Sequence, residues 1–235
     1  MIIRENIWKY MCELKTWLEE TSDVPLEEMS AFFSARIDSY EEHMAVWENA
    51  YRRFAELLPD GCETVLDLGC GTGLELDEIF KRIPVLHVTG VDLCTDMLDK
   101  LLKKHRDKNL QTVCADYFDY EMGENRWDAV LSFESLHHFF PEKKLTLYRK
   151  IYRGLKEGAV FLFGDYLACC EEEETLLRQV YLEKRAKAQI PEERFVHFDI
   201  PLTLEHETGL MKAAGFRDIR PVDCINGAAM LLVGK

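Results

Sequence analysis

Residues 65–73 read Val-Leu-Asp-Leu-Gly-Cys-Gly-Thr-Gly, and this stretch decides the fold. An apolar run carries an acidic residue, three glycines then alternate with small residues, and a helix-like pattern follows from Leu74. Glycines at 69, 71 and 73 have no Cβ, so the backbone can turn sharply and let a ligand approach closely. The spacing is G-x-G-x-G, whereas dinucleotide sites have G-x-G-x-x-G. The stretch predicts a strand, a tight turn at a ligand site and the start of a helix.

Three further apolar runs follow, and polar residues stand at their ends. Val85 to Val91 ends at Asp92, Leu110 to Ala115 ends at Asp116-Tyr117, and residues 127–133 read Trp-Asp-Ala-Val-Leu-Ser-Phe. In an open parallel sheet, ligands bind in a crevice outside the carboxyl ends of the strands. A carboxylate at the end of the second strand can accept two hydrogen bonds from ribose hydroxyls. These residues therefore predict a nucleoside site along one edge of a sheet.

With these runs in place, the sequence resembles the class I methyltransferases that use S-adenosylmethionine. In that family the glycine loop wraps the amino-acid end of the cofactor, and the acidic residue before it helps hold the ammonium. The resemblance implies that Asp92 binds the ribose and that Asp116 lies near the adenine amino group. The cofactor-binding residues that it implies are Tyr40, Asp67, Gly69, Cys70, Gly71, Gly73, Asp92, Leu93, Met97, Asp116, Tyr117 and Phe133.

Simpler roles stand beside these assignments. Asp67 and Asp92 could be strand-end carboxylates that bind loop amides, and Met97 and Tyr117 could serve packing alone. Tyr40 could equally be a core residue. The resemblance covers about residues 60–166 and 203–235, and the first 60 residues less specifically.

From Thr64 the predicted strands and helices alternate, which implies parallel pairing with right-handed crossovers. Thr203 is a plausible helix N-cap, Gly215 fits the C′ position of that helix, and Asn226-Gly227 suits a hairpin turn. The expected fold is α/β: a Rossmann-like, doubly wound, seven-stranded sheet, mostly parallel with a C-terminal antiparallel hairpin, plus N-terminal helices. The predicted strands are 64–68, 85–91, 110–114, 128–133, 159–165, 216–222 and 228–233, and the predicted helices of this region are 74–82, 96–105, 142–155 (ending at Gly158) and 203–214.

Two regions are expected to cover the cofactor and the substrate. Residues 1–60 form an N-terminal helical extension, with a helix over 3–20 and one or two helices over 27–57. Phe33, Arg36 and Tyr40 are spaced by three and four, which predicts that they share one helical face. Residues 61–235 form the methyltransferase domain, with a lid-like insertion at about 166–202. Within the insertion, Glu171 to Lys187 is predicted to be helical, with an acidic start and a basic end.

The residues that follow the fourth and fifth strands are the candidates for catalysis. His137 and His138 lie in the run Glu134-Ser-Leu-His-His-Phe, and a histidine near the transferred methyl could act as a general base. The alternative is that both histidines only pack the start of the next helix. Asp165 faces the crevice as a strand-end residue. His197 and Asp199 either bind substrate or pair with each other.

Composition narrows the classes of partner. The net charge is −14, and residues 1–60 alone hold thirteen acidic and six basic residues, which disfavours nucleic acid because binding it depends on neutralising phosphates. The eight cysteines form no Cys-x-x-Cys pair, so no metal site is predicted. Dispersed thiols, no signal-peptide pattern and no apolar stretch of about 18–20 residues predict a cytoplasmic protein without membrane spans. A homodimer is left open as the assembly.

The expected function is transfer of a methyl group from S-adenosylmethionine to a small-molecule acceptor by direct displacement at the sulfonium methyl. The sulfonium already activates the methyl, so the protein mainly aligns the reacting atoms. A side-chain base is needed only when the nucleophile is protonated at working pH. Two alternatives remain: a methyltransferase that acts on protein or tRNA, and a non-catalytic S-adenosylmethionine-binding interaction protein.

Overall fold

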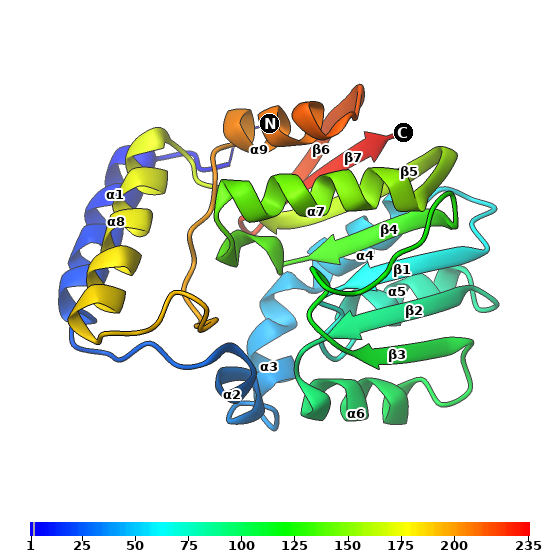
Figure 1. Ribbon diagram of the computed structural model, residues 1–235, viewed down its shortest axis with the longest axis horizontal. Helices are drawn as coiled ribbons and strands as arrows, with labels where there is room; N and C mark the ends of the chain where they lie inside the picture. The colour runs from blue at the N-terminus through cyan, green and yellow to red at the C-terminus, as the bar shows by residue number, and fades with distance from the viewer. Residues whose placement is uncertain (2) are drawn as a thin grey trace.

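A seven-stranded sheet in the order β3-β2-β1-β4-β5-β7-β6 organises the computed structural model, which describes residue 1 and residues 3–235 (Figure 1). The first five strands run parallel to one another, and β7 pairs antiparallel with both β5 and β6. This order confirms the predicted doubly wound sheet with an antiparallel C-terminal pair. The strands are β1 (Thr64–Leu68), β2 (His87–Asp92), β3 (Leu110–Cys114), β4 (Trp127–Phe133), β5 (Leu155–Tyr166), β6 (Asp218–Ile225) and β7 (Ala228–Gly234).

Helices cover both faces of this sheet. In Figure 1, α7 and α9 lie in front of the strands, while α4 and α5 lie behind them. The helices are α1 (Ile7–Glu20), α2 (Met29–Ser34), α3 (Tyr40–Met44), α4 (Glu48–Leu57), α5 (Leu74–Arg82), α6 (Thr95–Lys104), α7 (Pro141–Gly154), α8 (Glu171–Lys187) and α9 (Leu204–Ala214), with 3-10 turns η1 (Ala45–Trp47) and η2 (Leu136–His138). None of the described helices combines the length and the apolar character that a membrane span needs.

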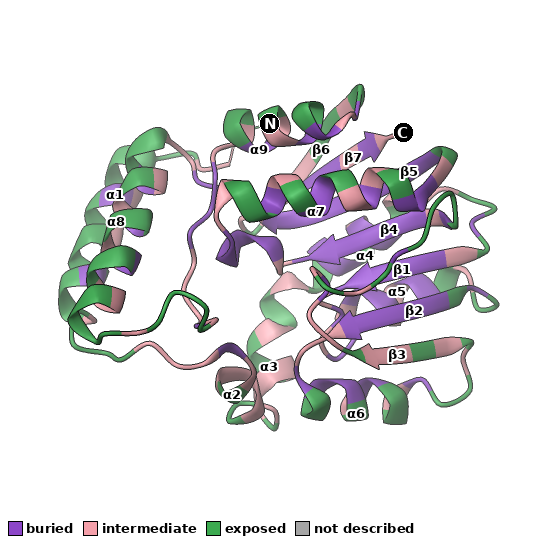
Figure 2. Ribbon diagram, viewed as in Figure 1, coloured by how far each residue is buried: buried purple, intermediate pink, exposed green. Residues whose placement is uncertain are grey.

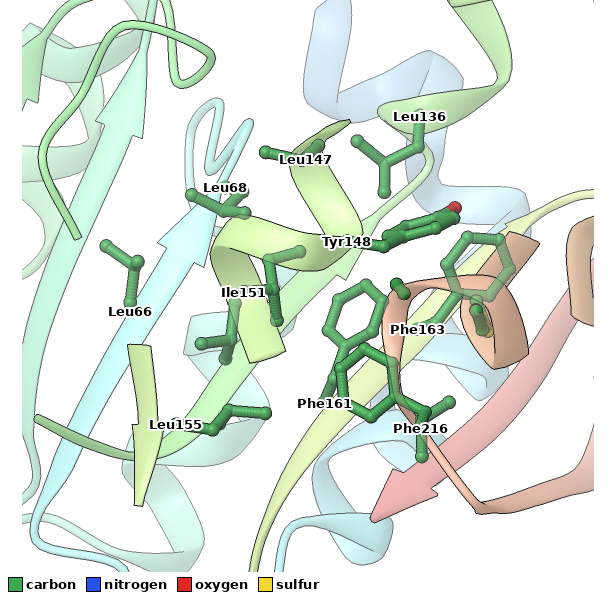
Figure 3. Packing of buried hydrophobic residues seen from close by; sticks show 14 of the residues in the cluster. Leu66, Leu68, Leu136, Leu147, Tyr148, Ile151, Leu155, Phe161, Phe163 and Phe216 are labelled. Atoms are coloured by element: carbon green, nitrogen blue, oxygen red, sulfur yellow. The ribbon is translucent and has the colours of Figure 1, made fainter. Parts of the chain in front are cut away.

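The core has two halves, one on each face of the sheet, because successive strand residues point to opposite faces. Phe161 and Phe163 of β5 pack against α7 and α9, whereas Val160 and Leu162 face α4 and α5. Figure 3 shows Tyr148 of α7 close to these two phenylalanines, and Figure 2 shows the central strands buried while the outer helix faces are exposed. Burying each large apolar side chain stabilises the fold by about 1.5–3 kcal/mol.

The predicted caps of α9 and the predicted hairpin turn are confirmed, whereas β6 covers Asp218–Ile225 and not the predicted 216–222. Thr203 Oγ1 accepts a hydrogen bond from the backbone N–H of His206 at 3.3 Å, which caps α9. Gly215 has φ +119° at the C-terminal end of that helix. Asn226 and Gly227 both have positive φ, +52° and +89°, which suits a two-residue hairpin turn of type I′.

Other predicted boundaries are wrong in detail. Helix α1 begins at Ile7, because the Asn6 side chain accepts the Lys9 N–H at 3.0 Å and caps it there. Helix α7 ends at Gly154, and the chain turns at once into β5, where Leu155 pairs with Trp127. Gly158, with φ +74°, therefore lies inside a strand and does not end the helix.

The expected single helical face of Phe33, Arg36 and Tyr40 is also wrong. Helix α2 ends at Ser34 and α3 begins at Tyr40, and the residues between form turns. Asp38 and Ser39 favour such a break because their side chains compete with the helical backbone for hydrogen bonds. Phe33 and Tyr40 still meet, with ring centroids 5.9 Å apart at an interplanar angle of 82°. Arg36 pairs with Glu27 at 2.7 Å and lines the same cavity as Phe33 and Tyr40.

Helices α1 and α8 lie side by side at the left of Figure 1, so the N-terminal segment packs on the insertion. Lys15 of α1 pairs with Glu172 of α8 at 2.5 Å. At the other end of the helix pair, Lys184 Nζ donates to the carbonyl oxygen of Thr21 at 2.7 Å. The two regions that sequence analysis assigned to a cover are therefore in contact with each other.

Candidate active site

The glycine loop connects β1 to α5 at the carboxyl edge of the sheet, and its backbone requires glycine. Gly69, Gly71 and Gly73 have φ of +73°, +48° and +71°, a region that side chains rarely tolerate. A Cβ at Gly69 would lie 2.0 Å from Ser135 Oγ, and one at Gly73 would lie 2.4 Å from a methyl carbon of Leu101. The loop therefore brings bare backbone to the end of the sheet, as the spacing predicted.

Asp92 at the end of β2 is tied to this loop. Its Oδ2 accepts a hydrogen bond from the Gly71 N–H at 2.9 Å, and its Oδ1 accepts one from the Cys94 N–H at 2.8 Å. Burial raises the pKa of the Asp92 carboxyl, although these backbone hydrogen bonds oppose that effect. A carboxylate has about four lone-pair sites, so Asp92 keeps acceptor capacity for hydroxyl groups.

A cavity with an open volume of about 70 Å³ lies beside the loop, and most of the predicted cofactor residues meet there. Cys70 and Gly73 line a smaller adjoining cavity, and Asp67 is buried inside the sheet. Nine of the twelve predicted residues line the first cavity: Tyr40, Gly69, Gly71, Asp92, Leu93, Met97, Asp116, Tyr117 and Phe133.

Two buried acidic residues lie at the base of the loop. Asp67 is 1% exposed and Glu75 is 6% exposed, and neither Asp67 carboxyl oxygen has a hydrogen-bond partner among the described residues. Burial raises the pKa of Asp67 to about 6, and burial together with the Asp67 charge raises the pKa of Glu75 well above its usual value. Glu75 also lines the small cavity against the glycines. A cationic ligand group would be favoured there because it compensates the buried acid.

A second cavity of about 630 Å³ adjoins the first. The two share Phe33, Tyr40, Glu134 and His138 as lining residues. The walls of the second cavity come from the N-terminal segment, from the chain after β4 and from the insertion. The sheet edge thus carries two connected compartments, a narrow one at the glycine loop and a wider one beneath α2 and the insertion.

Of the four candidate catalytic residues, His137, His138 and His197 line the wider cavity, whereas Asp165 is buried behind His137 and does not face the crevice as predicted. His137 Nδ1 lies 2.5 Å from Asp165 Oδ1, and Asp165 is itself held by the backbone N–H of Leu136 at 3.0 Å. The rings of His138 and His197 have centroids 5.1 Å apart. His197 stacks on Phe32 at a centroid distance of 3.6 Å, and it does not form the predicted simple pair with Asp199.

Asp199 instead faces the two adjacent histidines. Its Oδ1 lies 3.4 Å from His137 Nε2 and 3.3 Å from His138 Nδ1. Burial disfavours a charge on His137, but Asp165 and Asp199 outweigh burial and raise the pKa of His137 well above its usual value. Burial and the neighbouring His137 lower the pKa of His138. The cluster therefore joins two imidazoles and two carboxylates at one end of the cavity.

Sequence reasoning did not single out Glu134, which lines both cavities. Its φ is +49°, an uncommon conformation for a residue with a side chain, and burial raises the pKa of its carboxyl to about 8. The sequence signal that could have identified Glu134 is its position directly after the fourth apolar run. Other lining residues of the first cavity gave no local signal: Met29, Ser30, Ser135, Phe139 and Phe195.

Comparisons with known proteins agree with this geometry. A family model described as a methyltransferase domain matches residues 65–158. The chain is similar to the carboxy-S-adenosyl-L-methionine synthase of Nautilia profundicola, with 24% identity over 183 residues that cover 74% of this chain and 77% of that protein. It is also similar to the malonyl-acyl-carrier-protein O-methyltransferase of Priestia megaterium, with 29% identity over 108 residues, 43% of this chain and 36% of that protein.

A solved structure shows the same fold. Human N-acetylserotonin methyltransferase in complex with S-adenosylmethionine aligns with a TM-score of 0.65 at 21% identity, covering 97% of this chain and 66% of that one. The methyltransferase-domain match over residues 65–158 and the relatives named for S-adenosylmethionine or for methyl transfer support a class I S-adenosylmethionine-dependent methyltransferase, with S-adenosylmethionine as the cofactor.

Proposed function

We propose that this protein transfers the methyl group of S-adenosylmethionine to a small-molecule acceptor that binds in the second cavity. The observation that carries the proposal is the junction of the two cavities at Phe33, Tyr40, Glu134 and His138. A cofactor in the first compartment and an acceptor in the second would meet at these residues. The second compartment, at about 630 Å³, is within the range of small-molecule sites.

The residues of the first cavity have the chemical groups that S-adenosylmethionine requires. In this proposal Asp92 accepts hydrogen bonds from the ribose hydroxyls, Asp116 lies at the adenine, and Leu93 and Met97 supply apolar contacts. The glycine loop and Glu75 suit the amino-acid end, where an ammonium would compensate the buried acid. When bound, S-adenosylmethionine supplies a methyl group that is activated by its sulfonium.

Short elements of the N-terminal segment cover the first cavity. Phe33 and Tyr40 close it from one side, and they belong to two short helices joined by turns. We propose that residues 1–60 and the insertion at 166–202 act as the cover of the domain formed by 61–235, and that α2 and α3 move outward when the cofactor enters.

Arg4 in the second cavity supports an anionic acceptor, although Glu134 and Asp199 also line this cavity. Arg4 lines this cavity, and its Nε is buried without a hydrogen-bond partner among the described residues. Its guanidinium lies 4.3 Å from the centre of the Tyr10 ring. An arginine with unused donors suits a carboxylate, which it can bind with two parallel hydrogen bonds. The histidines line the same cavity, so the reacting atom of an acceptor bound to Arg4 would lie among them.

The experiment is a transfer assay with S-adenosylmethionine labelled in its methyl group. A panel of hydroxy acids and amino acids is compared with the corresponding amides, and total protein and tRNA are tested in parallel. We expect label in a small acidic compound and a higher KM for that compound in Arg4→Gln. Label in protein or tRNA would overturn the small-molecule acceptor, and cofactor binding without transfer to any class would indicate an interaction protein.

A second candidate follows from the similarity to carboxy-S-adenosyl-L-methionine synthases, which extends over 74% of the chain. Their name describes a product made from the cofactor itself. If this chain did the same, mass spectrometry would find a carboxylated nucleoside after incubation with carboxylic acids. Methyl transfer predicts demethylated cofactor in the amount of methylated acceptor.

A further inference from the structure

We propose that His137, His138 and Asp199 bind a divalent transition-metal ion at the histidine-rich end of the second cavity. One ligand atom from each residue can be chosen so that all of them lie within 4.8 Å of one another. Two of the residues follow β4, and the third comes from the insertion about 60 residues later, so only the fold brings them together. Binding of the ion does not depend on the proposed methyl transfer. Only the role given to the ion rests on that proposed function.

The spacing of the ligand atoms matches one ion between them. Asp199 Oδ1 lies 3.4 Å from His137 Nε2 and 3.3 Å from His138 Nδ1. Zinc binds imidazole nitrogen and carboxylate oxygen at about 2.0–2.2 Å, so two ligands at a tetrahedral angle stand about 3.3–3.5 Å apart. Direct hydrogen bonds would be shorter, with a usual N–O distance of about 2.9 Å.

The hydrogen bonds around His137 also point to a cation. Asp165 occupies the Nδ1 side of the ring at 2.5 Å, which leaves Nε2 of the neutral ring as a lone pair directed at Asp199. Asp199 Oδ1 is buried and has no hydrogen-bond partner in the described part of the chain. Metal-ligating histidines commonly donate their other nitrogen to a carboxylate, which fixes the ring. Asp165 holds His137 in this way.

His138 requires one exchange of partners. Its Nδ1 is 3.1 Å from the carbonyl oxygen of Phe198, a contact in which a protonated Nδ1 donates. Binding of an ion at Nδ1 replaces this hydrogen bond, and the Phe198 oxygen remains beside the site. The backbone that carries Phe198 and Asp199 also carries His197, whose ring packs on Phe32, so α2 supports the segment.

The ligand set selects the class of ion. Two imidazole nitrogens and one carboxylate oxygen suit zinc or iron(II), whereas magnesium and calcium prefer oxygen ligands throughout. Three protein ligands leave at least one coordination position open. All three residues line the cavity of about 630 Å³, so an acceptor in that cavity can reach the open position.

Such an ion would deepen the proposed function by selecting an oxygen nucleophile. A hydroxyl group that coordinates a divalent ion has a lowered pKa and releases its proton to water near neutral pH. The oxygen then forms a bond to the sulfonium methyl carbon, while the carbon–sulfur bond breaks and its electron pair passes to sulfur. Arg4 lines the same cavity and would bind the carboxylate of a hydroxy acid whose hydroxyl group coordinates the ion.

The test measures metal binding to the full chain without cofactor or acceptor, so its outcome does not depend on methyl transfer. Chelator-treated protein is titrated with Zn²⁺, with Fe²⁺ under anaerobic conditions, and with Mg²⁺ as a control ion, and Co²⁺ absorption reports the coordination. We expect one Zn²⁺ or Fe²⁺ per chain and no saturable Mg²⁺ binding. Asp199→Asn and His138→Gln should each weaken binding by at least about tenfold.

His206→Gln is the matched control variant. His206 and Glu174 form an exposed histidine–carboxylate pair at 2.8 Å that lies outside both cavities, so this variant should keep full affinity. Circular dichroism and S-adenosylmethionine titration establish that each variant is folded. Folded Asp199→Asn and His138→Gln with unchanged affinity, or wild-type protein without stoichiometric binding, would overturn the metal site and leave a His137 imidazolium between Asp165 and Asp199.

Discussion

Asp92 Oδ2 accepts a hydrogen bond from the Gly71 N–H at 2.9 Å, which joins the end of β2 to the glycine loop. The contact holds the Asp92 carboxylate beside the backbone of a glycine, which has no side chain to block a ligand. The proposed ribose site depends on this pairing, because the loop sets the position of the carboxyl group and the carboxyl group stabilises the loop.

Replacing Asp92 tests that site. Asp92→Ala removes the acceptors for both hydroxyl groups, and hydrogen bonds to charged groups contribute about 1.5–3 kcal/mol each. We expect the affinity for S-adenosylmethionine, measured by isothermal titration, to fall by at least about tenfold. Asp92→Asn, which keeps one acceptor oxygen, should lose less. An affinity in Asp92→Ala equal to that of the wild type would remove the ribose assignment.

A methyl group at Gly69 should damage both the loop and the cofactor site. The new Cβ would lie 2.0 Å from Ser135 Oγ at a φ of +73°. Strain of this kind costs about 1–3 kcal/mol, so Gly69→Ala should lower the free energy of unfolding by that amount and weaken cofactor binding. Gly209→Ala is the control, because its Cβ meets nothing within 4 Å inside α9. There the change should stabilise the protein by up to about 1 kcal/mol.

The stability of the protein should depend strongly on both members of the Lys144–Glu207 pair. Lys144 Nζ donates to Glu207 Oε2 at 2.6 Å, both side chains are fully buried, and Tyr148 also donates to Glu207. Lys144→Met leaves a buried carboxylate without its cation, which costs about 3–5 kcal/mol in denaturant unfolding. Lys144→Met combined with Glu207→Leu should recover most of that loss. Equal stability of the single variant and the wild type would contradict this account.

Asp128 should make stability depend on pH in the acid range. Burial opposes its charge, but Lys156 at 2.7 Å and the Thr64 hydroxyl and N–H outweigh burial and lower its pKa to about 2. Because the folded pKa lies below the unfolded value, the stabilisation is full above about pH 4 and disappears as the pH falls toward 2. Asp128→Asn should therefore lose about 2 kcal/mol at pH 7, discounted for partial exposure, and much less at pH 2.5. A loss that is equal at both pH values would contradict the assigned cause.

Most of the sheet could be predicted because its strands are short apolar runs that end in acidic or polar residues. Parallel pairing then places Gly69, Asp92 and Asp116 at one edge, so local patterns suffice to bring these distant residues together. The hairpin at Asn226-Gly227 was predictable for a similar reason, since its turn chemistry is local.

The second cavity was less predictable because its residues are brought together by tertiary packing. Asp199 meets His137 only through the path of the insertion, and Arg4 reaches the cavity where the N-terminal segment lies against the β6–β7 hairpin at Gly227. The break between α2 and α3 depends on the weak tendency of Asp38 and Ser39 to interrupt a helix. The helical spacing of Phe33 and Tyr40 predicted a continuous helix instead. Glu75 was missed because an acidic residue in the first turn of a helix usually serves the helix dipole.

The most direct test of the account is a crystal structure of the protein with S-adenosylhomocysteine and a hydroxy acid that accepts label in the transfer assay. We predict the ribose hydroxyls at Asp92, the amino-acid end along Gly69–Gly73, and the acid in the second cavity with its carboxylate at Arg4. A nucleoside bound away from the glycine loop, or an acceptor outside the cavity that adjoins it, would contradict the proposed function.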